Sequence, residues 1–228
     1  MGTRVAPTFA CLFMGVIEFL MLRAWKGLQP NFYKRYIDDC FFFWTGSEQE
    51  LLAFINHLNN FHPFLKLKAS YNFVTRSVDF LDTVISINDN GLISTTLYVK
   101  PGKRNNLLLT SSCHPNHIFE NIPYSSALRL KRICSLHTDF LELLDVLKST
   151  LMDRGYKCNY IMKAYDKVVN ISRSDALKKV EKNIVIRPVL PLIYDPRLPN
   201  ISNILYRFWK VMIKNPILKK IFPEPPQV

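Results

Sequence analysis

Two adjacent aspartates, Asp38 and Asp39, interrupt a run of aromatic and apolar residues that extends from Phe32 to Trp44. Two carboxylates repel each other and lose hydration when they enter an apolar core together, so the chain must carry them to a surface or to a cation. The flanking apolar residues favour extended strands. The segment is therefore predicted to be a tight β-hairpin with the aspartates at or beside its turn.

Paired carboxylates on a hairpin are one way to hold a divalent cation. Mg²⁺ prefers carboxylate oxygens together with phosphate oxygens. In nucleotidyl transfer, two such ions activate a 3′-hydroxyl and stabilise the leaving pyrophosphate. The Asp-Asp dipeptide is also common in ordinary hairpin turns, and from the dipeptide alone the ordinary turn is favoured.

The two halves of the chain differ in their predicted elements. Turn signals and hydrophobic periodicity predict helices and strands in the first hundred residues, with helices at 8–25 and 47–61 and strands at 65–73, 78–87 and 92–99. Ser47 is the expected N-cap of the second helix, and Asn90-Gly91 predicts a hairpin turn between the last two strands. After residue 100 they predict helices at 116–121, 125–136, 138–152, 159–169, 174–182 and 201–213, with an extended segment at 184–194. The fold class is therefore predicted to be α+β, with segments 1–100, 101–182 and 183–228.

The chain is strongly basic. Lysine and arginine number 30 against 18 acidic residues, which gives a formal net charge of +12. Such an excess predicts an anionic partner, with nucleic acid ahead of a membrane surface. The densest group is the best candidate for a phosphate-facing surface, and it comprises Lys100, Lys103, Arg104, Arg129, Lys131 and Arg132. A second group is interpreted as ordinary solvated charge: Arg207, Lys210, Lys214, Lys219 and Lys220.

Cysteine usage and the N-terminus indicate an intracellular protein, nuclear or cytoplasmic, that is not secreted. The five cysteines include no Cys-x-x-Cys pair, which favours free thiols in a reducing compartment over a zinc site. The apolar run 9–22 contains Glu18 and lacks a small-residue cleavage site, so we expect a core helix there. A membrane partner is not expected, because a lysine-rich helix with a clean apolar face is not evident.

Several motifs, taken in order, resemble those of reverse transcriptases. Tyr36-Ile37-Asp38-Asp39 resembles the Tyr-x-Asp-Asp signature, called motif C. Residues 2–18 look like motif B and its helix, residues 65–68 fall where motif D is expected, and residues 78–82 look like motif E. The whole series, with Ser112-Cys113-His114-Pro115 and Arg154-Gly155-Tyr156, is similar to Penelope-like retroelements.

The resemblance implies a partial polymerase palm, made of a helix and antiparallel hairpins, followed by a helical thumb. Asp38 and Asp39 would be catalytic ligands of Mg²⁺, and the partners would be an RNA template, a DNA primer and a deoxynucleotide. The expected nucleic-acid contacts in the palm are Gly2, Tyr36, Lys66, Lys68, Phe80 and Leu81.

The sequence also departs from the family. It begins inside motif B, so we expect the motif A aspartate and the fingers to be missing, and it stops near Pro226, before the endonuclease that follows the reverse transcriptase in many relatives. We expect Mg²⁺ to bind weakly or not at all, and the 228-residue chain to be catalytically incompetent while keeping a template–primer surface.

An alternative interpretation is a non-enzymatic nucleic-acid-binding module. The stretch from about residue 65 to 135 also resembles the animal helix-turn-helix domain of such elements, with the predicted helices 116–121 and 125–136 as its pair. Most of the second helix is apolar and must be buried, so backbone binding is expected rather than reading of a DNA sequence.

Overall fold

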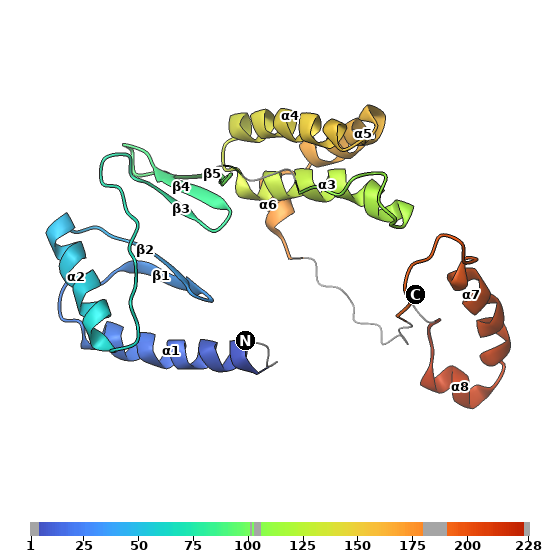
Figure 1. Ribbon diagram of the computed structural model, residues 1–228, viewed down its shortest axis with the longest axis horizontal. Coiled ribbons are helices and arrows are strands. Elements are labelled where there is room, and N and C mark those ends of the chain that lie inside the picture. The colour runs from blue at the N-terminus through green and yellow to red at the C-terminus, as the bar shows by residue number, and fades with distance from the viewer. Residues whose placement is uncertain (1–4, 101, 103–105, 180–190, 226–228) are drawn as a thin grey trace. The chain divides into compact units, whose positions relative to one another are not determined.

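The computed structural model describes residues 5–100, 102, 106–179 and 191–225. The chain divides into two compact units, an N-terminal unit (Met1–Lys103) and a C-terminal unit (Arg104–Val228). The described residues form helices and two small antiparallel sheets (Figure 1), which confirms the predicted α+β class. Each unit is described by itself below.

The predicted hairpin is confirmed in the N-terminal unit. Strand β1 (Asn31–Tyr36) pairs antiparallel with β2 (Asp39–Phe43), and Tyr36 lies opposite Asp39. Two residues, Ile37 and Asp38, therefore form the loop. The aromatic residues lie in the two strands, and the aspartates lie at the turn, where their carboxylates stay hydrated.

The core of this unit is built around Phe54. Helix α2 (Glu48–Phe61) begins after Ser47, the predicted N-cap, which forms a capping box with Glu50, and it buries Phe54 completely. The rings of Trp25, Phe42 and Trp44 lie 5.5–5.6 Å from that of Phe54. Since Trp25 follows helix α1 (Ala6–Ala24) and Phe42 belongs to β2, this one ring joins α1, α2 and the hairpin.

Helix α1 is less buried than predicted. Met21 is its buried residue, while several large apolar side chains are exposed: Phe9, Leu12, Phe13, Val16, Phe19 and Leu20. Within the part of the chain that the structure describes, α1 is also the one helix long and apolar enough to cross a membrane. A signal sequence or the core helix of a soluble protein passes the same test of length and composition.

The second sheet is a meander of β3 (Ser77–Phe80), β4 (Thr83–Ile87) and β5 (Ile93–Leu97). The Asn-Gly turn before β5 is confirmed, with Gly91 at φ 76°. The prediction of one strand over 78–87 is wrong, because the chain reverses at Leu81 and Asp82. Leu81 has a φ of 55°, which places it inside the turn.

Residues 65–73 do not form the predicted strand. Asn59 of α2 takes the backbone groups that a strand would need: its amide donates to the Leu67 carbonyl at 3.1 Å and its carbonyl accepts from the Leu67 N–H at 2.5 Å. Further along, Asn72 accepts from two backbone N–H groups in an Asx turn. Side chains thus replace the ladder partners of this segment.

The C-terminal unit is helical. Its elements are α3 (Asn116–Ile133), α4 (His137–Asp153), α5 (Cys158–Val169), α6 (Arg173–Leu177), α7 (Ile201–Met212) and α8 (Pro216–Ile221). Helix α3 packs against both α4 and α5. The predictions for α4, α5 and α7 are confirmed. Helix α6 is shorter than predicted, α8 was not predicted although Asn215 caps it, and most of the segment 184–194 lies outside the described residues.

The predicted break between helices 116–121 and 125–136 is wrong, because α3 continues through Pro123. Proline removes one backbone hydrogen bond and disfavours a helix interior. Pro123 is fully buried, however, and Ala127 and Leu130 follow it on the same buried face. Burial of this face offsets the lost hydrogen bond. The two helices predicted as a helix-turn-helix pair are therefore parts of the single helix α3.

The motif Arg154-Gly155-Tyr156 has a structural role at the turn between α4 and α5. Gly155 has a φ of 87°, and a Cβ at this position would collide with the Thr110 side chain. The Thr110 N–H donates to the Arg154 carbonyl at 3.1 Å, and the Tyr156 hydroxyl donates to the Leu108 carbonyl at 3.1 Å. These contacts fasten the segment before α3 to the α4–α5 turn.

We predict that Gly155→Ala lowers the free energy of opening of α3–α5 by about 2–4 kcal/mol, because it adds the collision with Thr110 to the strain of a positive φ. Gly91→Ala is the matched control, since its φ is also positive but open space surrounds it, and it should cost β4 and β5 only about 1–2 kcal/mol. Hydrogen exchange of the corresponding peptides measures both, and equal effects would contradict the role given to Thr110.

Candidate functional site

The turn that carries the aspartates is strained. Ile37 has a φ of 56°, a left-handed conformation that is rare for a β-branched residue and is usually supplied by glycine at such a turn. Asp38 and Asp39 are both exposed at this end of the hairpin. The surrounding structure must therefore hold the loop in place.

Arg35 is the residue that holds it. Its guanidinium donates to the Ile37 carbonyl at 2.9 Å and to the Cys11 carbonyl of α1 at 3.2 Å. Its Nε lies 2.8 Å from Glu18 Oε1, and the two side chains are only 14 % and 12 % exposed. The interaction with Glu18 raises the pKa of Arg35. One cation thus ties the strained turn to α1.

Tyr33 and Cys40 complete this polar cluster. The Tyr33 hydroxyl donates to Glu18 Oε1 at 3.1 Å and lies 3.3 Å from Cys40 Sγ. Burial, followed by the interaction with Cys40, raises the pKa of Tyr33 well above its usual value. Burial also raises the pKa of the Cys40 thiol. Both groups therefore stay protonated and act as donors to Glu18 at neutral pH.

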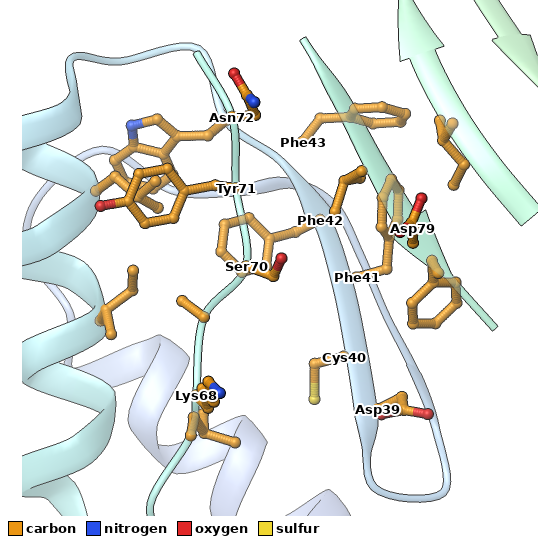
Figure 2. A pocket seen from close by; sticks show the side chains of 18 of the residues that line it. Asp39, Cys40, Phe41, Phe42, Phe43, Lys68, Ser70, Tyr71, Asn72 and Asp79 are labelled. Atoms are coloured by element: carbon orange, nitrogen blue, oxygen red, sulfur yellow. The ribbon is translucent and has the colours of Figure 1, made fainter. Parts of the chain in front are cut away.

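A hollow of about 710 Å³ lies beside the hairpin, between β2, β3 and residues 66–73 (Figure 2). It gathers residues that the sequence assigned to one site, and its lining includes Asp38, Asp39, Lys66, Lys68 and Phe80. Of the other predicted palm residues, Tyr36 is exposed on β1, Leu81 is exposed in the β3–β4 turn, and Gly2 lies outside the described residues.

The groups around the hollow differ in how they are used. Lys66 and Lys68 are both exposed, and the Lys66 ammonium donates to the Asn59 carbonyl at 2.6 Å. The rings of Phe41 and Phe80 lie 5.3 Å apart and join β2 to β3. Within the described residues, no three His, Cys, Asp or Glu side chains cluster as metal ligands. A cation at Asp38 and Asp39 would therefore depend on water or phosphate for its remaining ligands.

The predicted basic cluster is divided between the two units. Lys100 is exposed in the N-terminal unit, Arg129 is exposed in the C-terminal unit, and Lys103 and Arg104 lie outside the described residues. Lys131 is 8 % exposed, with its ammonium 4.4 Å from the centre of the Phe140 ring. It takes part in core packing through this cation–π contact.

Arg132 also has a structural partner. Its Nε donates to the Ala176 carbonyl of α6 at 2.7 Å, while Arg173 donates to the Arg132 carbonyl at 3.3 Å. These two bonds join the end of α3 to α6. Two basic residues of α3, Lys131 and Arg132, therefore stabilise the packing of the C-terminal unit.

Helix α5 carries a basic surface that the sequence analysis missed. Its inner face buries Ile161, Ala164, Tyr165 and Val168, and the Tyr165 hydroxyl donates to the Leu144 carbonyl of α4 at 3.1 Å. The opposite side exposes two cations one turn apart, Lys163 and Lys167. Their i, i+4 spacing was visible in the sequence, but it becomes a surface only once the inner face is known.

Charge separates α5 from α4. Helix α4 carries four acidic residues and one lysine, whereas residues 154–167 carry four basic residues and one aspartate. A polyanion is attracted to the second segment and repelled by the first.

The animal helix-turn-helix domain family matches residues 106–166. The matched stretch comprises α3, α4 and most of α5, and it begins with the segment that packs on the α4–α5 turn. It overlaps the predicted helix-turn-helix region but lies further along the chain than residues 65–135. Comparison with curated proteins and with solved structures finds no match.

We predict that Glu18 and Arg35 are energetically coupled. Substituting either with alanine leaves the other largely buried charge without its partner, so each single change should cost about 2–4 kcal/mol and the double change less than their sum. Urea denaturation of the four proteins of the cycle gives the coupling energy. The exposed pair Arg76 and Asp89, 3.9 Å apart, is the control and should show no measurable coupling. Additive effects at Glu18 and Arg35 would contradict the prediction.

Proposed function

We propose that the chain binds nucleic acid and that α5 is the helix that faces it. The observation that carries this proposal is the match of residues 106–166 to the animal helix-turn-helix domain. In such motifs the second helix of the pair meets the major groove while the first crosses the backbone. Helices α4 and α5 suit these roles, because four residues that include Gly155 join them.

Charge and burial support α5 as the contacting helix. Arg154 and Lys157 precede it, and Lys163 and Lys167 are exposed along it, while its apolar side is packed in the core. Helix α4 has a net negative charge and would be repelled by phosphates. The net charge of +12 adds a general attraction to polyanions.

The contact is proposed to be mainly with the phosphate backbone. Lysine acts as a flexible point charge, whereas base reading depends on groups with bidentate geometry, such as arginine, asparagine or glutamine. Binding is therefore expected to depend steeply on salt and weakly on sequence.

The double variant Lys163→Gln/Lys167→Gln tests this proposal. Each lost phosphate contact lowers the slope of log K against log salt by about 0.9 for duplex DNA, so we expect the slope to fall by up to about 1.8 and the affinity to fall equally for unrelated sequences. Fluorescence anisotropy with two labelled duplexes of different sequence measures both quantities.

The matched control is Lys26→Gln/Lys34→Gln, which removes the same charge from exposed positions in the N-terminal unit. It should leave the slope nearly unchanged. Equal effects of the two variants would mean that net charge alone governs binding. Loss of binding to one duplex only would indicate sequence reading by α5, and either result would overturn backbone contact at this helix.

A second candidate function is that of a template–primer-binding remnant of a reverse transcriptase related to Penelope-like elements. It is supported by the resemblance of Tyr36-Ile37-Asp38-Asp39 to motif C and by the hollow that gathers Asp38, Asp39 and Lys68. In this proposal Mg²⁺ binds weakly at the two aspartates, and the chain by itself does not polymerise.

Primer extension by the purified 228-residue chain, with Mg²⁺ or Mn²⁺, tests the second candidate. We expect no template-directed synthesis above background. Synthesis that Asp38→Ala abolishes would show that the chain is an active polymerase. Asp89→Ala is the control for the loss of an exposed carboxylate elsewhere in the same unit.

A further inference from the structure

A one-sided basic stripe runs along α7 and the turn that follows it. Arg207 and Lys210 lie on α7 and Lys214 lies in the turn that follows, at intervals of three and four residues. At 3.6 residues per turn this spacing places all three cations along one side of the helix, over a length of about 10 Å. Helix α8 adds Lys219 and Lys220.

The cations of the stripe and the two lysines of α8 are exposed, and acidic residues lie only outside residues 196–223. All five side chains are exposed, and no ion pair involves them within the described residues. Residues 196–223 contain no aspartate or glutamate. A segment with these exposed cations and no carboxylate between residues 196 and 223 is complementary to a polyanion.

One side of α7 is buried or half-buried. Trp209 is buried, and Leu205 and Met212 are half-buried beside it. These three residues recur at intervals of four and three, so they share one side of α7 and leave the cations on the opposite side. The stripe is therefore a consequence of the way in which the helix folds, and not a chance grouping along the sequence.

We propose that this basic stripe is a second contact with nucleic acid, which binds the phosphate backbone without reading bases. The proposal rests on the proposed function for its class of partner, but on different residues. Duplex DNA carries one charge per about 1.7 Å of its axis, so a stripe of about 10 Å meets enough phosphates to engage all three cations together.

A membrane surface is the competing partner, because Ile204, Phe208 and Val211 are exposed next to the stripe. Membrane-surface helices place such apolar residues in the acyl boundary and tryptophan at the headgroups. Here Trp209 is buried in the protein and cannot take that position. The observations therefore favour nucleic acid, and binding to vesicles is included in the test.

The experiment compares the full chain with the triple variant Arg207→Gln/Lys210→Gln/Lys214→Gln in anisotropy titrations with a short duplex over a range of salt concentrations. Loss of three phosphate contacts should lower the slope of log K against log salt by about 2 to 3. The matched control is Arg23→Gln/Lys26→Gln/Lys34→Gln, which removes the same charge from exposed positions and should change the slope little. Circular dichroism checks that both variants keep the helical content of the parent.

Two results would overturn the proposal. One is a slope for the triple variant that equals that of the control. The other is an unchanged slope together with lost binding to phosphatidylserine-containing vesicles, measured against pure phosphatidylcholine vesicles, which would assign the stripe to a membrane.

Comparison with the α5 variant Lys163→Gln/Lys167→Gln separates the two proposals. A slope change in the α7 variant alone supports the stripe and contradicts the proposed contact at α5. A slope change in the α5 variant alone contradicts the stripe and leaves the proposed contact at α5 in place.

Discussion

The largely buried ion pair between Glu18 and Arg35 is the interaction on which the N-terminal unit depends. It joins α1 to the hairpin. The same guanidinium donates a hydrogen bond to the Ile37 carbonyl in the strained turn. Tyr33 and Cys40 stay protonated because of burial and add donors to Glu18. The turn that carries the aspartates is therefore held by a cluster of polar side chains. The aromatic rings around Phe54 pack α1, α2 and the hairpin together.

The C-terminal unit is fixed in a different way, by close backbone approach. Gly155 lets Thr110 pack on the α4–α5 turn, and Tyr156 fastens the segment before α3. Helix α5 begins directly after this turn. A residue needed for packing thus positions the helix that carries Lys163 and Lys167, which connects the family match over residues 106–166 to a specific basic face.

The role of each basic residue depended on packing more than on its place in the sequence. Lys131 and Arg132 belong to the densest predicted cluster, yet one lies over the Phe140 ring and the other bonds to Ala176. Arg207, Lys210 and Lys214 were interpreted as ordinary surface charge, and the inner face of α7 places them in one line. Sequence spacing gives the charge of a segment, but only the buried face of a helix decides which charges share a surface.

The sequence by itself determined the hairpin that carries Asp38 and Asp39, the capped start of α2, the Asn-Gly turn and the α+β class, because hydration, capping and turn geometry act over a few residues. It did not determine the continuity of α3 through Pro123, the loss of the strand at 65–73, or the fate of Lys131. Those depend on the burial of a distant face, on the Asn59 side chain and on the Phe140 ring. Such contacts join residues that only the tertiary structure brings together, and their free energy exceeds the local preferences that the sequence expresses.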